Sequence, residues 1–254
     1  MNPLVTTNYD VSLVVLSLFL SFIGSFVALS VTARILQTKT PSLLNIAAAG
    51  LALGGVGVWS MHFIGMLALN MDVGTSYSPT ETIISLLLAV VSVSVALSQL
   101  VKNPGSMPRL VTAGTAVGLS VAAMHYLGMY GLKLGGYIAW DLPTMALSVL
   151  IAVVAAVAAL WLSLNIVGVA SRIAAASVMT LAVSAMHYVG MSAANFVCTT
   201  ANRNAVPRGF GYIASFELPT LVFSISLSLV ALIVLDQLLQ AYLGAKPGLQ
   251  TSKS

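Results

Sequence analysis

The chain has 254 residues, of which 59% are hydrophobic and only 6% are charged, and its mean hydropathy is +1.01. An ordinary soluble domain carries about 25% charged residues, so this composition excludes a soluble globular protein, and the hydrophobicity excludes a disordered one. The ten lysines and arginines are scattered singly, which excludes a nucleic-acid-binding patch. A single cysteine, Cys198, excludes an internal disulfide. The expected fold class is an all-α membrane protein.

Seven uncharged stretches reach the roughly 20 apolar residues that a membrane-spanning helix needs. They are Val11–Ala33, Leu43–Leu69, Thr82–Val101, Leu110–Leu132, Leu142–Val167, Ile173–Val197 and Leu218–Leu235. We expect a single membrane domain over residues 1–254. Within it we expect three two-helix pseudo-repeats over 11–201, a seventh helix over 218–242 and a short cytoplasmic tail over 243–254.

The basic residues predict the orientation, because lysine and arginine gather on the cytoplasmic side of membrane proteins. Seven of them follow odd-numbered spans or lie in the tail: Arg34, Lys39, Lys102, Arg109, Arg172, Lys246 and Lys253. The opposite side has three, namely Lys133, Arg203 and Arg208. We therefore expect the N-terminus outside and the C-terminus in the cytoplasm. The N-terminus lacks the positive region of a cleaved signal peptide, so the first span is expected to be retained.

A hexapeptide of the form Met-His-aromatic-aliphatic-Gly-Met occurs three times and holds every histidine of the chain. Its copies are MHFIGM at Met61–Met66, MHYLGM at Met124–Met129 and MHYVGM at Met186–Met191. Weaker related segments, such as Tyr77–Glu81 and Tyr137–Thr144, open odd-numbered helices. Each period contains two helices, so all copies share one orientation in the membrane. Three such units predict a pseudo-threefold arrangement with one hexapeptide on each even-numbered helix.

Within each hexapeptide the His, the Gly three residues later and the Met four residues later lie on one helical face. Imidazole binds zinc, copper, iron and nickel, whereas thioether sulfur selects Cu(I). Zinc would more often recruit carboxylate or thiolate partners. The pattern predicts a metal site, with copper as the leading candidate, and no catalytic residues. The expected ligands are first His62, His125 and His187, then Met66, Met129 and Met191, and behind them Met61, Met124 and Met186.

Other interpretations of the same residues stay open. The hexapeptide is also compatible with helix packing, in which histidines bond across helices and glycines allow close approach. Four acids open helices and are either hydrogen-bond partners of the histidine rings or, as we favour, helix starts. They are Asp10, Glu81, Asp141 and Glu217. Cys198 is a further candidate metal ligand, but it belongs to no repeated motif.

At these hexapeptides the sequence resembles the MHYT family of bacterial integral membrane sensors, from about Val11 to Ala201 plus a seventh helix. The first copy departs from the family name with Phe63 in place of Tyr, and an aliphatic residue replaces Thr in all three. The resemblance implies a multi-pass protein of the bacterial inner membrane. It also implies copper bound through the motif His and Met, and a response to oxygen, carbon monoxide, nitric oxide or redox state.

In the family such a module commonly precedes a cyclic-di-GMP enzyme, a histidine kinase or a DNA-binding domain. Too few residues follow Leu243 to fold as an output domain. We therefore expect a sensor without its own enzymatic activity, whose cytoplasmic signalling domain is separate or has been removed. Three alternatives remain. One is a seven-helix zinc hydrolase with three histidine ligands and a carboxylate base. The others are a haem sensor that uses two of the histidines, and a metal conduit.

Overall fold

The structure is a computed structural model that describes residues 4–37, 42–214 and 217–245. Over these residues, seven helices are long and apolar enough to cross a membrane, which confirms an all-α, multi-pass membrane protein. The second span is built from three consecutive segments, and the remaining spans are single helices. The helices are α1 (Val11–Gln37), α2 (Leu43–Gly50), η1 (Leu51–Ser60), α3 (Met61–Leu67), α4 (Pro79–Leu100), α5 (Met107–Gly131), α6 (Leu142–Asn165), α7 (Val169–Ser192) and α8 (Leu218–Ala245).

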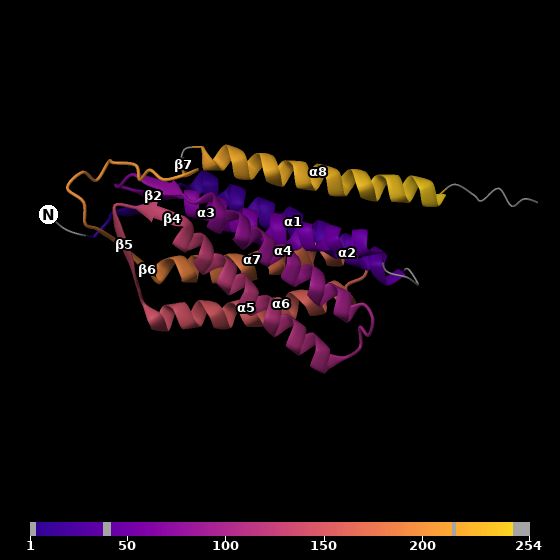
Figure 1. Cartoon of the computed structure of the whole chain (residues 1–254). Coiled ribbons are helices and arrows are strands. Elements are labelled where there is room, and N and C mark those ends of the chain that lie inside the picture. The colour runs from indigo at the N-terminus through magenta and orange to yellow at the C-terminus, as the bar shows by residue number, and fades with distance from the viewer. Residues whose placement is uncertain (1–3, 38–41, 215–216, 246–254) are drawn as a thin grey trace, which may run out of the picture.

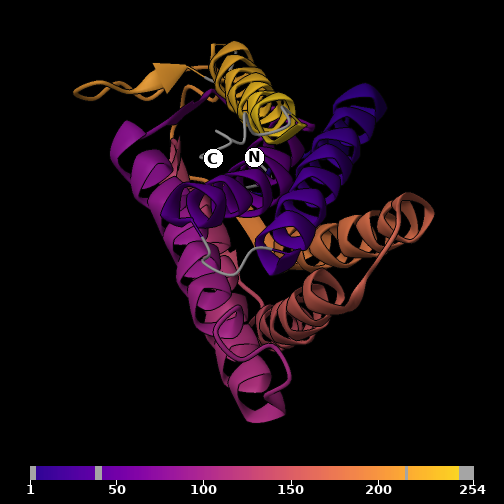
Figure 2. The same ribbon diagram turned by 90° about the vertical axis from the view of Figure 1, so that its right-hand side faces the viewer.

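The first six spans form a closed arrangement of three helix pairs, and the seventh lies outside it (Figure 1, Figure 2). α4 packs against both the second span and α5, and α6 packs against both α5 and α7. α1 closes the arrangement by packing against α7 and the second span. α8 packs mainly on η1, with smaller contacts to α3 and α1. This confirms three two-helix units plus a seventh helix.

Short antiparallel strands join the helices at one end of the bundle, here called the strand end. We call α5, α7 and the second span, which ends with α3, the hexapeptide helices, and we call α1, α4 and α6 the peripheral helices. In each of three pairs, the strand that follows a hexapeptide helix pairs with the strand that precedes a peripheral helix. The pairs are β1 (Thr7–Tyr9) with β2 (Leu69–Met71), β3 (Thr75–Tyr77) with β4 (Leu132–Leu134), and β5 (Gly136–Trp140) with β6 (Ala194–Cys198). β7 (Ile213–Ala214) adds to the free side of β3.

These strands correct the sequence expectation at one boundary. The sixth span was expected to run to Val197, but α7 ends at Ser192 and residues Ala194–Cys198 form β6. Phe196 and Val197 have high strand propensity, and pairing with β5 satisfies the backbone groups that a longer helix would have used. The chain therefore turns from helix to strand five residues after His187.

Two of the acids at helix starts cap their helices, and a third forms an ion pair. The Asp10 carboxylate accepts the backbone N–H of Ser12 at 2.8 Å, and Asp141 accepts that of Thr144 at 3.0 Å. Hydrogen bonds from the Thr144 hydroxyl and backbone lower the pKa of Asp141. Glu81 forms an ion pair with Lys133 at 3.1 Å. These contacts support the helix-start interpretation.

The opposite end of the bundle, here called the basic end, carries the described basic residues that the sequence assigned to the cytoplasm: Arg34, Lys102, Arg109 and Arg172. Three others, Lys39, Lys246 and Lys253, lie outside the described residues. Lys133, Arg203 and Arg208 lie with the strands. The two ends thus differ in charge as the sequence predicted, and α8 runs toward the basic end (Figure 1).

The second span differs from its two equivalents because η1 is a π-helix of ten residues. The Ser60 hydroxyl donates to the Gly55 carbonyl at 3.0 Å, five residues earlier. Close packing accompanies this segment, since a Cβ at Gly54 would lie 2.5 Å from the Ala89 carbonyl oxygen of α4. π-helical turns are rare in proteins overall, and those that occur often lie at functional sites. This one leads directly into the first hexapeptide.

Candidate metal centre

The three histidines meet at the centre of the bundle. Each lies five or six residues before the end of its hexapeptide helix, and each is at most 1% exposed. The Nδ1 atom of His62 lies 3.0 Å from that of His125 and 3.1 Å from that of His187. Within the described part of the chain, these three side chains form the only group of His, Cys, Asp or Glu placed to hold a metal ion. The convergence expected from the repeat is therefore present.

The other ring nitrogens point away from the cluster and toward glycines. All three Nε2 atoms are buried without a hydrogen-bond partner. Each lies against the glycine of another hexapeptide, so that a Cβ on that glycine would lie 2.3 to 2.4 Å from the nitrogen. The cyclic pairs are His62 with Gly128, His125 with Gly190 and His187 with Gly65. The third residue after each histidine, a glycine, thus makes room for the imidazole of a neighbouring hexapeptide.

The chemistry of this donor set fits a cation. A neutral imidazole carries one proton, so protons on the outward Nε2 atoms would leave three Nδ1 lone pairs facing one another. Such lone pairs repel unless a cation lies between them. Nitrogens bound to zinc lie about 2.0–2.1 Å from the metal. In a trigonal-planar arrangement, three such nitrogens would lie about 3.5 Å from one another. The observed 3.0 and 3.1 Å are slightly tighter, so a small outward movement of the rings would accommodate an ion.

Aromatic rings pack against each histidine on the side that faces the strand end. The aromatic residue of every hexapeptide packs edge-on against its own histidine, with centroids 4.8 to 4.9 Å apart. The same ring contacts a second aromatic residue that precedes a peripheral helix, at 5.3 to 6.2 Å. The pairs are Phe63 with Tyr77, Tyr126 with Trp140, and Tyr188 with Tyr9. Burial raises the pKa of Tyr77 and of Tyr9, so both phenols stay protonated.

The departure at Phe63 has a structural counterpart. The Tyr126 hydroxyl bonds to Ser148 of α6, and the Tyr188 hydroxyl bonds to Ser17 of α1. The corresponding serine of α4, Ser85, instead accepts a hydrogen bond from Trp59 Nε1 at 3.0 Å. The indole therefore replaces the missing phenol in the first unit.

The six motif methionines flank the histidines in the sequence and are all buried, with at most 4% of each residue exposed. Met186 borders a small cavity on the basic side of the histidines, and Met129 borders a larger pocket at the strand end. The ligand roles that the sequence assigns to the methionines remain predictions.

The small cavity has a volume of about 40 Å³ and an entirely apolar lining. Three of its walls are valines, each four residues before a histidine and hence one helical turn toward the basic end: Val58, Val121 and Val183. The cavity therefore shares the pseudo-threefold arrangement of the histidines. Sequence reasoning missed it, although the repeated valine at this spacing was a visible signal.

The remaining candidates are not part of the histidine cluster. The Nδ1 atoms contact one another and the Nε2 atoms have no partner, so no acid of the described chain bonds to a histidine ring. Cys198 lies in β6, where its sulfur contacts Thr200 at 3.8 Å.

Comparison with known proteins places the chain in a family. The MHYT family model, described as a bacterial signalling protein N terminal repeat, matches residues 55–113, 118–176 and 181–243. The chain belongs to the MHYT family. Each MHYT match begins on a hexapeptide helix and extends over the helix that follows, so the third match includes α8. In space, however, α1 packs between α7 and the second span, and α8 lies outside.

Several curated proteins resemble the chain. It is 34% identical over 249 residues to the bifunctional diguanylate cyclase/cyclic di-GMP phosphodiesterase MucR of Pseudomonas aeruginosa, which covers 94% of the chain and 35% of MucR. It is 30% identical over 196 residues to an uncharacterized signaling protein of Caulobacter vibrioides, covering 76% of the chain and 24% of that protein. It is 26% identical over 236 residues to the signaling protein YkoW of Bacillus subtilis, covering 88% and 28%. The chain thus spans about a third or less of these relatives. No solved structure matches it.

Proposed function

We propose that this chain is the sensory module of a bacterial signalling protein, and that it binds copper through the Nδ1 atoms of His62, His125 and His187. The observation that carries the proposal is the convergence of three buried Nδ1 atoms, two pairs of which lie 3.0 and 3.1 Å apart. Soft methionine sulfur beside each histidine favours Cu(I) over harder ions. Bound copper would supply a one-electron redox couple and an affinity for diatomic ligands.

The residues around the site would hold and shield the ion. The glycines at positions 65, 128 and 190 keep the Nε2 edges of the rings against backbone, so only Nδ1 faces the centre. The aromatic pairs cover the rings from the strand end. Exclusion of water in this way strengthens the interactions between ligand and ion.

The apolar cavity supports a role in sensing a diatomic gas such as oxygen, carbon monoxide or nitric oxide. Apolar cavities of proteins stay dry and bind small apolar molecules. With a volume of about 40 Å³ and one valine from each hexapeptide helix, the cavity lies one turn from the histidines. A gas held there would be next to the metal.

The route by which the signal leaves is proposed to run through η1 and α8. The Ser226 hydroxyl of α8 donates to the Ser60 hydroxyl at 2.6 Å, and Ser60 lies two residues before His62. A movement of the His62 ring would therefore reach α8, which runs toward the basic end. That end is proposed to face the cytoplasm, where a signalling domain of cyclic-di-GMP enzyme or histidine kinase type would receive the movement. The similarity to MucR, a bifunctional diguanylate cyclase/cyclic di-GMP phosphodiesterase, supports the first type.

The alternatives have less support. The ring centroids of the histidines lie 4.8 to 5.3 Å apart, which leaves no room for a porphyrin between them. A zinc hydrolase would need a carboxylate base beside its ligands, and the cluster found in the described residues contains only histidines.

Metal analysis of the purified full chain tests the proposal. We expect one copper per chain, and no copper when His62, His125 and His187 are all replaced by Ala. Cys198→Ser is the matched control, because it removes a soft ligand outside the cluster and should leave the copper content unchanged. Copper that persists in the triple variant, or zinc in its place after copper loading, would overturn the copper assignment. A Soret band in the optical spectrum would favour haem instead.

The gas proposal has its own test. Val121→Leu adds one methylene group to the wall of the cavity and should weaken carbon monoxide binding to the reduced, copper-loaded chain. Val111→Leu, on the exposed face of the same helix, should not. Equal carbon monoxide affinity in both variants would contradict a role for the cavity.

A further inference from the structure

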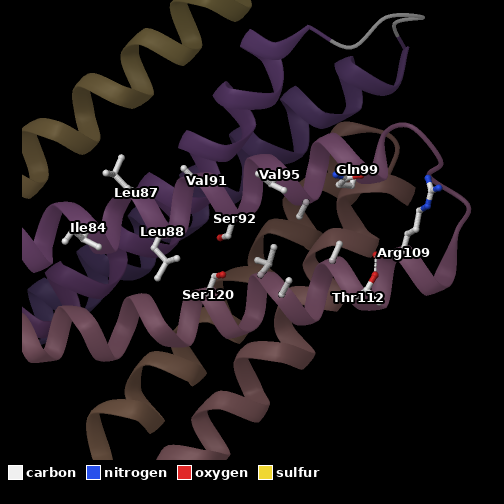
Figure 3. A pocket seen from close by; sticks show the side chains of 14 residues that line it. Ile84, Leu87, Leu88, Val91, Ser92, Val95, Gln99, Arg109, Thr112 and Ser120 are labelled. Atoms are coloured by element: carbon white, nitrogen blue, oxygen red, sulfur yellow. Dashed lines mark hydrogen bonds between the residues drawn. The ribbon is translucent and has the colours of Figure 1, made fainter.

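A long groove lies on the outer surface of the bundle between α4 and α5 (Figure 3), and no histidine lines it. Its volume is about 860 Å³. Leu87, Val91 and Val95 of α4 line it and are about half exposed, at 55%, 53% and 52%. In a membrane-spanning bundle, such a surface of exposed large hydrophobic side chains faces lipid. The groove is therefore open to the bilayer rather than to water.

The length of the groove suits an extended chain. Its lining runs along α4 from Ile84 to Gln99, fifteen residues or about 22 Å at 1.5 Å per residue. That is more than half of the roughly 30 Å thickness of the hydrocarbon core. On the α5 side the lining includes Ala113 and Ala116, whose small side chains leave space beside α4.

The polar chemistry of the groove is concentrated at the basic end. Gln99, Arg109 and Thr112 lie together there, as Figure 3 shows, while the rest of the lining is apolar apart from two serines. The Thr112 hydroxyl is used by the backbone, since it donates to the Pro108 carbonyl at 2.9 Å. Arg109 is exposed, and all six acids of the chain are described, yet none forms a salt bridge with it.

Arg109 therefore presents a planar set of donors at the mouth of an apolar groove. An arginine guanidinium binds phosphate oxygens in pairs, and its charge is retained at any physiological pH. Lys102, in the turn between α4 and α5, is not among the residues that line the groove, so Arg109 supplies its positive charge. Basic pockets between spanning helices on the cytoplasmic side bind anionic headgroups.

We infer that this groove is a binding site for an anionic glycerophospholipid, with one acyl chain along α4 and α5 and the phosphate on Arg109. The charge at one end and the length of the apolar part together specify this occupant. A second copy of the chain would instead need an apolar or acidic helix to lie against Arg109. Dimer formation through the groove is thus the alternative that an experiment must separate.

Native mass spectrometry of the delipidated full chain in detergent tests the inference. Phosphatidylglycerol and phosphatidylcholine with identical acyl chains are titrated as probes. We expect the wild type to bind phosphatidylglycerol about fivefold more tightly, the factor that corresponds to one basic residue near an anionic lipid. Arg109→Gln should abolish this preference. Arg172→Gln, at the same end of α7 but away from the groove, should keep it.

A second pair of variants tests the apolar part. Ala116→Phe fills the groove and should weaken binding of both lipids, whereas Leu119→Phe on the exposed face of α5 should not. Inorganic phosphate should not compete, since the acyl chain supplies most of the contact. Retained lipid preference in Arg109→Gln, or equal binding in the two phenylalanine variants, would overturn the inference. The inference would also be overturned if the chain forms a dimer that Ala116→Phe dissociates and that added lipid does not dissociate. Unchanged helix content by circular dichroism verifies that each variant is folded.

Discussion

The Nε2 atom of His62 lies against the α-carbon of Gly128, so closely that a methyl group on that carbon would lie 2.3 Å from the nitrogen. The same relationship joins His125 to Gly190 and His187 to Gly65. Each hexapeptide thus supplies one ring to the cluster and one space for the ring of another hexapeptide. The histidines and glycines of the repeat form a single interlocked unit.

Gly128→Ala is predicted to push the His62 ring out of place, because the added methyl group has no room beside it. We expect a loss of about 1–3 kcal/mol in the free energy of unfolding, as for other overpacked cores, and at least tenfold weaker copper binding. Isothermal titration with copper and thermal unfolding measure these effects. Gly105→Ala is the control, because a Cβ there meets nothing within 4 Å. Equal behaviour of the two variants would disprove the interlock.

The indole of Trp59 is predicted to stand in for the hydroxyl that Phe63 lacks. Trp59→Phe removes a buried hydrogen bond to Ser85 and should cost about 1–3 kcal/mol, since the serine loses a partner. Adding Phe63→Tyr should recover part of this loss, because a phenol at position 63 occupies the place from which Tyr126 reaches Ser148. A double-mutant cycle by chemical unfolding gives the coupling. Strictly additive effects would speak against the replacement.

The hydrogen bond from Ser226 to Ser60 is predicted to carry the state of the centre to α8. In the wild type, copper loading should change amide hydrogen exchange in α8, and Ser226→Ala should remove that change while copper stoichiometry stays at the wild-type level. Ser224→Ala, on an exposed position of the same helix, should behave as wild type. If α8 responds to copper equally in both variants, the signal leaves by another path.

The methionines are predicted to contribute to Cu(I) affinity. Met191→Leu keeps a similar volume and should weaken Cu(I) binding about tenfold, measured by competition with a Cu(I) chelator. Met179→Leu is the matched control, since Met179 is equally buried on α7 but lies eight residues, or about 12 Å, before His187. Identical affinities in both variants would remove Met191 from the ligand set.

Several features could be read from residues alone. The scarcity of charge left seven apolar stretches whose starts and ends lie within a few residues of the observed helices, with β6 as the main exception. The recurrence of His62, His125 and His187 at nearly constant spacing required that equivalent helices carry them to one depth. Both conclusions follow from the bilayer, which demands long apolar helices and makes buried polar residues costly.

Other features required the fold. A repeat does not state which ring nitrogen faces the axis, and the packing of Gly65, Gly128 and Gly190 against Nε2 decides that it is Nδ1. Sequence similarity also does not show which helices are neighbours in space. The third family match includes α8, but it is α1 that packs between α7 and the second span. Composition and spacing are local properties of the chain and determined the spans and the candidate ligands. The direction of each ring, the apolar cavity and the place of α1 depend on contacts between distant segments, and only the tertiary structure decided them.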